Sequence, residues 1–283
     1  MTIRIASIQL NSQTDIDANL ATIKRAISDA APHADLIVLP ENMCVMGRQS
    51  GLAERFDEMC DALSDLAKTH QVHLLAGTLP CRVRADGTPV PDGKYRQTSL
   101  IFDDTGRQIA RYDKTHLFRA TVNDSTGSYD EGKTFEAGDE LIVAPLTIQG
   151  ETIHLGMMIC FDVRFPIMAQ RLRALGADII SVPAAFTYKT GEAHWRLLLQ
   201  ARALDSQCMM IGSTQGGTHH IGSSSRETWG HAMMVNAHGQ VVADSRQSEA
   251  GETGYAIIYG EFDKAEQERI RQSMPIFGCH RLN

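Results

Sequence analysis

The chain has 283 residues and a mass of 31.1 kDa, enough for one large domain with a sizeable hydrophobic core. Hydrophobic residues make up 43% of the chain and charged residues 22%, which is typical of a soluble globular protein. The net charge is −7 and no basic cluster is present, so nucleic acid is not expected as a partner. The longest stretch without Asp, Glu, Lys or Arg, residues 206–225, is too rich in Gly, Ser, Thr and His to span a membrane.

The six cysteines, at positions 44, 60, 81, 160, 208 and 279, form no Cys-x-x-Cys pair. A chain of this size does not need disulfides, so we expect reduced thiols. The first residues, Met-Thr-Ile-Arg-Ile-Ala, contain no apolar signal core, and we therefore expect a cytoplasmic location.

Short apolar runs alternate with longer amphipathic stretches in the first third of the chain. This pattern predicts strands at 3–10, 36–39 and 72–78 and helices at 19–31 and 52–69. In the middle of the chain, turn sequences between apolar runs predict two hairpins, one from 95–102 and 108–112 and one from 141–148 and 152–159.

The alternation of helices and strands then resumes. A proline at its start and a glycine after its end predict a helix over 166–176. The other predicted helices are 191–205 and 262–273, and the predicted strands are 179–182, 208–214, 233–235, 241–244 and 254–259. Residues 216–225 are interpreted as a loop particular to this chain.

Two segments of the chain have similar sequences. Residues 34–40 and 177–183 match in residue class at all positions but one, and each follows a predicted helix and ends at a proline. A duplicated α/β unit explains this similarity, although any helix-turn-strand segment of an α/β fold can have such a sequence. No linker divides the chain, so we predict one α/β domain over 1–283, with a layered sandwich of sheets and helices.

Three reactive side chains each directly follow an apolar strand: Glu41, Lys114 and Cys160. Sites in α/β sheets form outside the carboxyl ends of strands, so we expect these side chains to converge. A free thiol has a pKa of about 8.5 and needs help to act as a nucleophile. A carboxylate can take its proton, and an ammonium group can stabilise the thiolate and a later oxyanion, as can the N–H of Phe161 at a helix start. Taken singly, the three are ordinary: a core cysteine, a turn glutamate and a surface lysine.

The sequence blocks Leu-Pro-Glu41-Asn, Asp-Lys114-Thr-His-Leu-Phe and Ile-Cys160-Phe-Asp-Val-Arg-Phe-Pro resemble the three signatures of the nitrilase (carbon–nitrogen hydrolase) superfamily, in the same order. The segments 185–195, 201–208 and 274–277 resemble the Nit-type amidases of that superfamily. The resemblance covers nearly the whole chain, and the combination of blocks is specific.

This resemblance implies a role for each residue. Glu41 is implied as the general base and acid, Lys114 as the group that stabilises the oxyanion, and Cys160 as the nucleophile that forms a thioester. The family has a second glutamate between the lysine and the cysteine. Residues 129–138 match its position, which favours Glu131 over Glu136.

The implied activity is hydrolysis of a small carboxylate-bearing amide to an acid and ammonia. An ω-amide of a 2-oxo acid and deaminated glutathione are the favoured substrates; a nitrile or an N-carbamoyl compound is the alternative on the same triad. Arg164 either binds a substrate carboxylate or pairs with Asp162 or another acid, and Phe186 and Thr187 either line the pocket or pack in the core. Residues 119–127 and 216–225 differ from better-known Nit amidases, which leaves the substrate open.

Other functional classes fit the sequence less well. Eleven histidines, including the pair His219 and His220, suggest a metal site, but adjacent histidines point apart in a strand and no His-x-x-x-His frame exists, so neither metal nor cofactor is expected. A Cys–His–acid hydrolase using Cys160 and His194, or a glutamine amidotransferase, lacks its expected Gly-x-Cys-x-Gly turn. A non-catalytic scaffold is the alternative of another class.

The resemblance further implies the fold and the assembly. It implies a four-layer α-β-β-α sandwich that forms a homodimer or a homotetramer through its helical layers. We expect the C-terminal tail, residues 274–283, to lie at the subunit interface.

Overall fold

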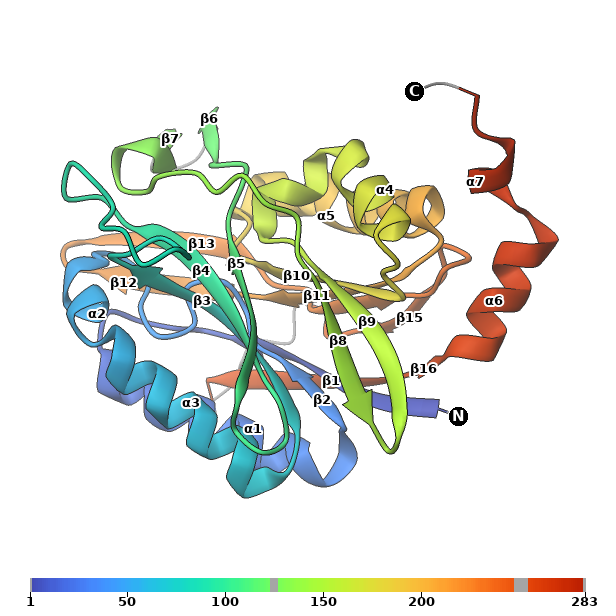
Figure 1. Ribbon diagram of the computed structural model, residues 1–283. Coiled ribbons are helices and arrows are strands. Elements are labelled where there is room, and N and C mark those ends of the chain that lie inside the picture. Colours follow the sequence, from blue (N-terminus) through green and yellow to red (C-terminus); the bar gives the residue numbers. More distant parts are fainter. Residues whose placement is uncertain (1, 123–126, 247–253, 282–283) are drawn as a thin grey trace.

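Two six-stranded β-sheets lie face to face in this computed structural model, and helices cover their outer faces (Figure 1). The structure describes residues 2–122, 127–246 and 254–281. In the first sheet the strands follow the order β16 (Tyr255–Asp263), β1 (Thr2–Leu10), β2 (Leu36–Val38), β3 (His73–Cys81), β4 (Arg96–Phe102) and β5 (Gln108–Asp113). In the second they follow the order β15 (Val241–Asp244), β14 (Met233–Val235), β11 (Met209–Thr214), β10 (Ile179–Ala184), β9 (Glu151–Met157) and β8 (Val143–Ile148).

The helices form the two outer layers of the sandwich. Helices α1 (Ile16–Ala30) and α3 (Phe56–His70) cover the first sheet, and α4 (Pro166–Ala174) and α5 (Tyr188–Ser206) cover the second (Figure 1). Short elements complete the chain: α2 (Ser50–Glu54), α7 (Ile276–Cys279), the 3-10 turns η1 (Ala31–His33), η2 (Glu131–Lys133) and η3 (Cys160–Arg164), and two small hairpins, β6 (Arg119–Thr121) with β7 (Ser128–Asp130) and β12 (Gly216–Ile221) with β13 (Ser224–Trp229).

Alternating side chains of the central strands explain why four layers form. In β2, Leu36 and Val38 pack toward the second sheet, whereas Ile37 packs against α1 and α3. Strands buried on both faces are expected between two apolar layers. The predicted fold class, a single-domain α-β-β-α sandwich, is confirmed.

Most predicted elements are present, with shifted ends. The predicted hairpins are β4–β5 and β8–β9, both antiparallel. The single helix predicted over 52–69 is wrong: it is divided into α2 and α3 at Arg55, whose backbone (φ −106°, ψ 18°) leaves the helical region. The helix predicted to start at Phe262 begins instead at Lys264, because β16 continues to Asp263, whose side chain caps the helix.

The interpretation of residues 216–225 as a loop is also wrong. These residues form most of the antiparallel hairpin β12–β13, with Gly216 opposite Trp229. As predicted for a strand, its adjacent histidines point apart: His219 is buried and His220 is exposed. This glycine- and serine-rich sequence lacks the apolar alternation that predicts a strand. The hairpin is attached to the rest of the protein by side-chain hydrogen bonds and not by an apolar face.

The repeated segments occupy corresponding places in the two sheets. β2 pairs in parallel with β1 and β3, and β10 pairs in parallel with β9 and β11. This placement agrees with a duplicated α/β unit, which remains a hypothesis.

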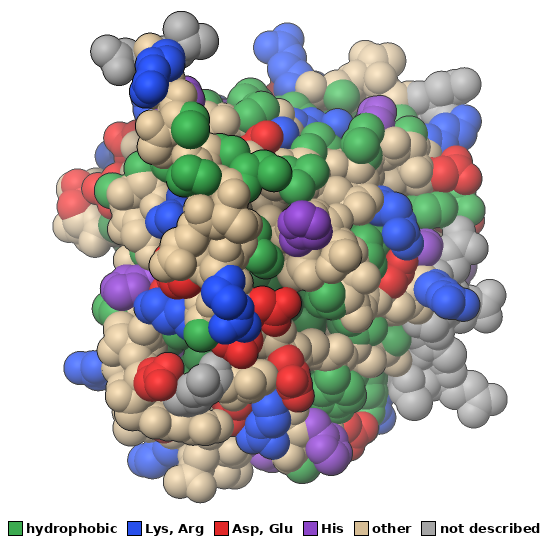
Figure 2. All heavy atoms as spheres, turned by 90° about the vertical axis from the view of Figure 1, so that its right-hand side faces the viewer, with side chains coloured by type: hydrophobic (Ala, Val, Ile, Leu, Met, Phe, Trp, Pro, Cys, Tyr) green, Lys and Arg blue, Asp and Glu red, His purple; other side chains and the backbone are tan. Residues whose placement is uncertain are grey.

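The last helices leave the sandwich as an arm. α6 (Lys264–Ser273) is held to the body by hydrogen bonds from Gln267 to Asp178 O and from Arg271 to Gln207 O, while α7 extends away from it (Figure 1). Met274 is 61% exposed. Hydrophobic side chains also gather in the upper half of the face shown in Figure 2, on the side of α4, α5 and the arm. In the described part of the chain, no helix is long and apolar enough to cross a membrane.

Candidate active site

Glu41 lies in the turn that follows β2, where Pro40 ends the strand. The Pro40 carbonyl packs directly on Gly77 of β3: a Cβ on Gly77 would lie 1.8 Å from that oxygen, so only glycine fits there. The next residue, Asn42, has a positive φ of 56° and its N–H donates to Thr78 Oγ1 at 2.8 Å. These contacts fix the backbone on both sides of Glu41, whose side chain is buried.

Lys114 follows β5, and its backbone is held on both sides. Its N–H donates to Gln97 O at 2.9 Å, and its carbonyl accepts from Gly138 N at 2.8 Å. The fully buried Nζ donates to Glu41 Oε1 at 2.8 Å and to Glu131 Oε2 at 2.9 Å. One ammonium group therefore links two carboxylates from segments 90 residues apart in sequence.

Cys160 opens the 3-10 turn η3 after β9, with a left-handed φ of 48°. Non-glycine residues with such a φ are uncommon and are often found at functional sites. Asp162, fully buried, holds the turn in place: its carboxylate accepts from Ile159 N, Tyr112 OH, and both the backbone N–H and Nδ1 of His116, at 2.7–3.0 Å. These contacts connect the Cys160 turn to the segment that carries Lys114.

The electrostatics of the site follow from one cation between two carboxylates. Burial disfavours the charged form of Lys114, but Glu131 and Glu41 outweigh it and raise the pKa of Lys114 well above its ordinary value. Burial also raises the pKa of Glu131, against the opposing effect of Lys114. Burial and the charge of Glu41 raise the pKa of Cys160, although Lys114 lowers it. The site therefore favours the neutral Cys160 thiol over its thiolate.

The structure distinguishes the two glutamates that the sequence offered between the lysine and the cysteine. Glu131 opens η2, bonds to Lys114 and accepts from Phe118 N at 2.7 Å. Glu136 instead pairs with Arg84 at 2.8 Å and with Arg96 at 2.7 Å.

A narrow cavity of about 30 Å³ borders these residues, and all eight site residues predicted from the sequence except Lys114 line it. Its remaining walls come from the turn after β2, the segment before β6, the end of β10, the start of α5, and β13. The lining residues are Glu41, Asn42, Phe118, Glu131, Cys160, Phe161, Arg164, Ala185, Phe186, Thr187, Thr190 and Arg226.

Arg164 stands over two aromatic rings of this cavity, 5.8 Å from the centre of Phe161 and 5.0 Å from that of Phe186. Burial lowers its pKa. Its Nη1 donates to His194 Nδ1 at 3.2 Å, and within the described residues it has no carboxylate partner. The alternative pairing with Asp162 is therefore wrong, because Tyr112, His116 and the backbone occupy that carboxylate.

The same contact bears on the Cys–His alternative. His194 accepts its hydrogen bond from Arg164, and none with Cys160 is present among the described residues. The described residues also hold no group of three His, Cys, Asp or Glu side chains that could bind a metal. All six cysteines are unpaired thiols.

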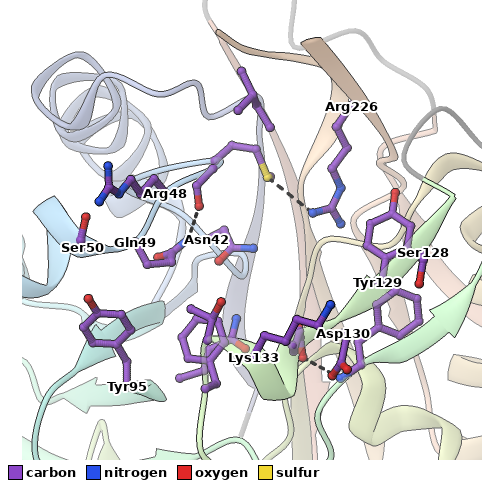
Figure 3. A pocket seen from close by; sticks show the side chains of 18 of the residues that line it. Asn42, Arg48, Gln49, Ser50, Tyr95, Ser128, Tyr129, Asp130, Lys133 and Arg226 are labelled. Carbon is purple, nitrogen blue, oxygen red and sulfur yellow. Dashed lines mark hydrogen bonds between the residues drawn. The ribbon is translucent and has the colours of Figure 1, made fainter. Parts of the chain in front are cut away.

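A second, wider cavity of about 550 Å³ adjoins the first and shares four lining residues with it: Asn42, Phe118, Glu131 and Arg226 (Figure 3). Sequence reasoning missed this outer cavity and the contributions of Asn42, Gln97 and Arg226. The asparagine directly after Glu41 was within a motif, but no sequence signal joins Gln97 or Arg226 to the site, because both come from distant strands.

Comparisons with known proteins agree with the geometry. The family model described as carbon–nitrogen hydrolase matches residues 4–272. A deaminated glutathione amidase of Yersinia enterocolitica is 34% identical over 283 residues, covering 98% of this chain and 93% of that protein, and one of Synechocystis sp. is 36% identical over 276 residues, covering 95% of each. The crystal structure of the Caenorhabditis elegans NitFhit protein matches 99% of this chain with a TM-score of 0.84 and 30% identity, and this chain spans 65% of that longer one. The chain therefore belongs to the carbon–nitrogen hydrolase family, as the sequence blocks around Glu41, Lys114 and Cys160 predict.

Proposed function

We propose that the protein hydrolyses the C–N bond of a small carboxylate-bearing amide through a thioester on Cys160. The observation that carries this proposal is the buried Lys114 ammonium bonded to Glu41 and Glu131, beside a cavity lined by the Cys160 thiol. Glu41 acts as general base and acid, Lys114 stabilises the oxyanion, and Glu131 orients Lys114.

The first half of the reaction acylates the enzyme. As the sulfur attacks the amide carbon, the thiol proton passes to Glu41 and the carbonyl π electrons move to oxygen. Glu41 Oε1 accepts from Lys114 and from Gln97 Nε2 at 2.9 Å, and Oε2 makes no hydrogen bond in the described part of the chain, so Oε2 takes the proton. Lys114 and the Phe161 N–H stabilise the oxyanion. The C–N bond then breaks, and Glu41 returns the proton to the leaving nitrogen.

The second half releases the acid. Water attacks the thioester carbon and gives a proton to Glu41, and the C–S bond breaks. Glu41 returns this proton to the sulfur, so Cys160 and Glu41 regain their starting states. Because Glu41 removes the thiol proton during the attack, Cys160 does not have to be ionised beforehand. A Cys160 pKa raised by burial is therefore compatible with activity.

The relatives named deaminated glutathione amidase support that substrate, and an ω-amide of a 2-oxo acid is the close alternative. Both carry a carboxylate on the acyl side, which Arg164 binds in this proposal, with Phe186 and Thr187 beside it. A nitrilase or an N-carbamoyl amide hydrolase would use the same triad. We also propose a cytoplasmic homodimer or larger assembly in which the arm of α6 and α7 and residues 274–283 contact the partner subunit; its exposed Met274 supports this contact.

The test is product release from deaminated glutathione and a panel of primary amides, nitriles and N-carbamoyl compounds, measured as ammonia or as free amine. Cys160→Ala is compared with Cys60→Ala, which removes a half-buried thiol outside both cavities and outside the arm. We expect hydrolysis of the carboxylate-bearing amides, a loss of at least about 10³-fold in Cys160→Ala and none in Cys60→Ala. Hydrolysis that survives in Cys160→Ala would refute the mechanism, and a folded wild-type protein inert on every compound would favour the scaffold alternative.

A further inference from the structure

The guanidinium of Arg226 lies where the two cavities meet, because Arg226 lines both of them. It comes from β13, in the hairpin β12–β13. Figure 3 shows its side chain descending toward the open centre of the outer cavity, and Lys133 pointing into the same space.

Arg226 has no anionic partner among the described residues. Its Nη2 donates to Ala185 O at 2.9 Å, its Nη1 approaches Met46 Sδ at 4.0 Å, and its guanidinium carbon lies 5.4 Å from the centre of the Tyr129 ring. Its Nε is buried and makes no hydrogen bond with any residue that the structure describes. A guanidinium fork that has only neutral acceptors is an unsaturated site for a carboxylate.

The acidic side chains of the outer cavity do not neutralise it. Glu131 is bonded to Lys114 and to Phe118 N, and Asp130 caps η2 by accepting from Gly132 N at 3.2 Å. Neither forms an ion pair with Arg226 or Lys133 within the described ranges.

The hairpin is fixed to the body of the protein, so Arg226 is held in place. Directly opposite Arg226 on β12, His219 bonds to Ser12 O and to Thr228 Oγ1, each at 2.7 Å. Asn11 Nδ2 donates to Gly216 O at 2.7 Å. A rigidly supported charge binds a ligand with a smaller entropic cost than a mobile one.

The two cavities differ in size, so they can accommodate different parts of a substrate. The inner cavity of about 30 Å³ leaves little free space beside Cys160, whereas the outer cavity offers about 550 Å³. The outer cavity, which Arg226 borders, has room for a substantial group on the amide nitrogen.

We infer that Arg226 is a specificity residue that binds a carboxylate on the nitrogen side of the amide. The substrate class is then a substituted amide with carboxylates at both ends, the acyl end at Arg164 and the amine end at Arg226. This inference rests on the proposed function and deepens it: it favours a tripeptide-sized amide such as deaminated glutathione, which ends in a glycine carboxylate, over a primary ω-amide.

The experiment measures kcat and KM on three compounds with the same acyl group: deaminated glutathione, its glycine carboxamide, and the primary ω-amide. Wild type is compared with Arg226→Met and Arg226→Lys, and with Arg107→Met as the matched control. Arg107 is 77% exposed in the turn between β4 and β5, about 20 Å from the Gln97 end of β4.

For Arg226→Met we expect KM for deaminated glutathione to rise about 10- to 100-fold, and kinetics on the primary amide to change by less than about twofold. Wild type should show a similar rise in KM on the carboxamide, with no further rise in the variant, and Arg226→Lys should recover part of the loss. Arg107→Met should match wild type.

Two results would overturn the inference while leaving the proposed function intact. One is an equal loss on all three compounds in a folded Arg226→Met, which would mean that Arg226 only supports the Ala185 wall. The other is wild-type activity on the primary amide with no preference for the glycine carboxylate. Wild type inert on all three compounds would instead contradict the proposed function itself.

Discussion

Replacing Gly77 by alanine tests whether the position of Glu41 depends on the neighbouring strand. An ideal Cβ on Gly77 would lie 1.8 Å from Pro40 O and 2.6 Å from its carbonyl carbon. Carbon atoms in favourable contact are about 3.5–4.0 Å apart, so the Pro40 carbonyl or β3 must move by roughly 1.5 Å. Both are backbone, and no rotamer change can relieve the clash. Glu41 is the next residue and moves with Pro40.

The size of this shift predicts the size of the kinetic effect. Misplacing a catalytic group by about 1 Å can cost about 100-fold in rate, so we expect kcat of Gly77→Ala to fall at least about 100-fold. KM should change less, because Arg164 and the aromatic walls come from other elements. Overpacking of this kind also lowers the free energy of unfolding by about 1–3 kcal/mol.

Steady-state kinetics on the favoured amide, with urea unfolding of the same samples, measure both effects. The matched control is Gly51→Ala in α2, whose Cβ would have its nearest neighbour at 3.9 Å. There alanine should leave kcat unchanged and stabilise the protein slightly, because alanine is the better helix former. A folded Gly77→Ala variant with kcat within about threefold of wild type would refute the reasoning that Pro40 positions the catalytic carboxylate.

Three further predictions test the supporting contacts. Glu131→Gln removes one of the two carboxylates that bond to Lys114, so kcat should fall about 10²–10³-fold, whereas Glu136→Gln should stay within about threefold of wild type. Asp162→Asn replaces an acceptor of four hydrogen bonds with a group that carries a donor, and chemical unfolding should show a loss of about 2–5 kcal/mol. Burial lowers the pKa of His219 to about 4, whereas a histidine in the unfolded chain has a pKa of about 6.5, so the unfolded chain binds a proton first as the pH falls. Relative to His219→Gln, wild type should therefore lose about 3 kcal/mol of unfolding free energy between pH 7 and pH 4. Parallel stability profiles of the two proteins would contradict this.

The sequence was most informative where a reactive side chain directly follows a predicted strand. Glu41, Lys114 and Cys160 each follow an apolar strand, and sites of α/β proteins form at strand ends, so their convergence was predictable. The sequence did not show that β5 is paired antiparallel or that β9 belongs to the second sheet. The choice of Glu131 rested on motif position alone, yet the structure brings that carboxylate to Lys114.

Contacts that depend on tertiary structure were not predictable. Gln97 lies within a strand and would pass for a surface residue, but it is buried and donates to Glu41 at 2.9 Å. Arg226 directly follows residues 216–225, whose composition indicated a loop, and the pairing of β12 with β13 brings it to the cavity. Gln97 is 56 residues from Glu41, and Arg226 is 41 residues from its acceptor Ala185; no local periodicity encodes such separations.

The charges of the site explain how a buried cysteine can be reactive without being a free thiolate. Two carboxylates surround one ammonium group, so ionising Cys160 in the resting state would add a second net negative charge to a dry site, and its pKa is accordingly raised. In the proposed mechanism the thiol proton moves to Glu41 and the new negative charge passes to the substrate oxygen, where Lys114 and the Phe161 N–H stabilise it. On that mechanism the site favours the transition state over the free thiolate, and the thiol stays protonated until an amide is bound.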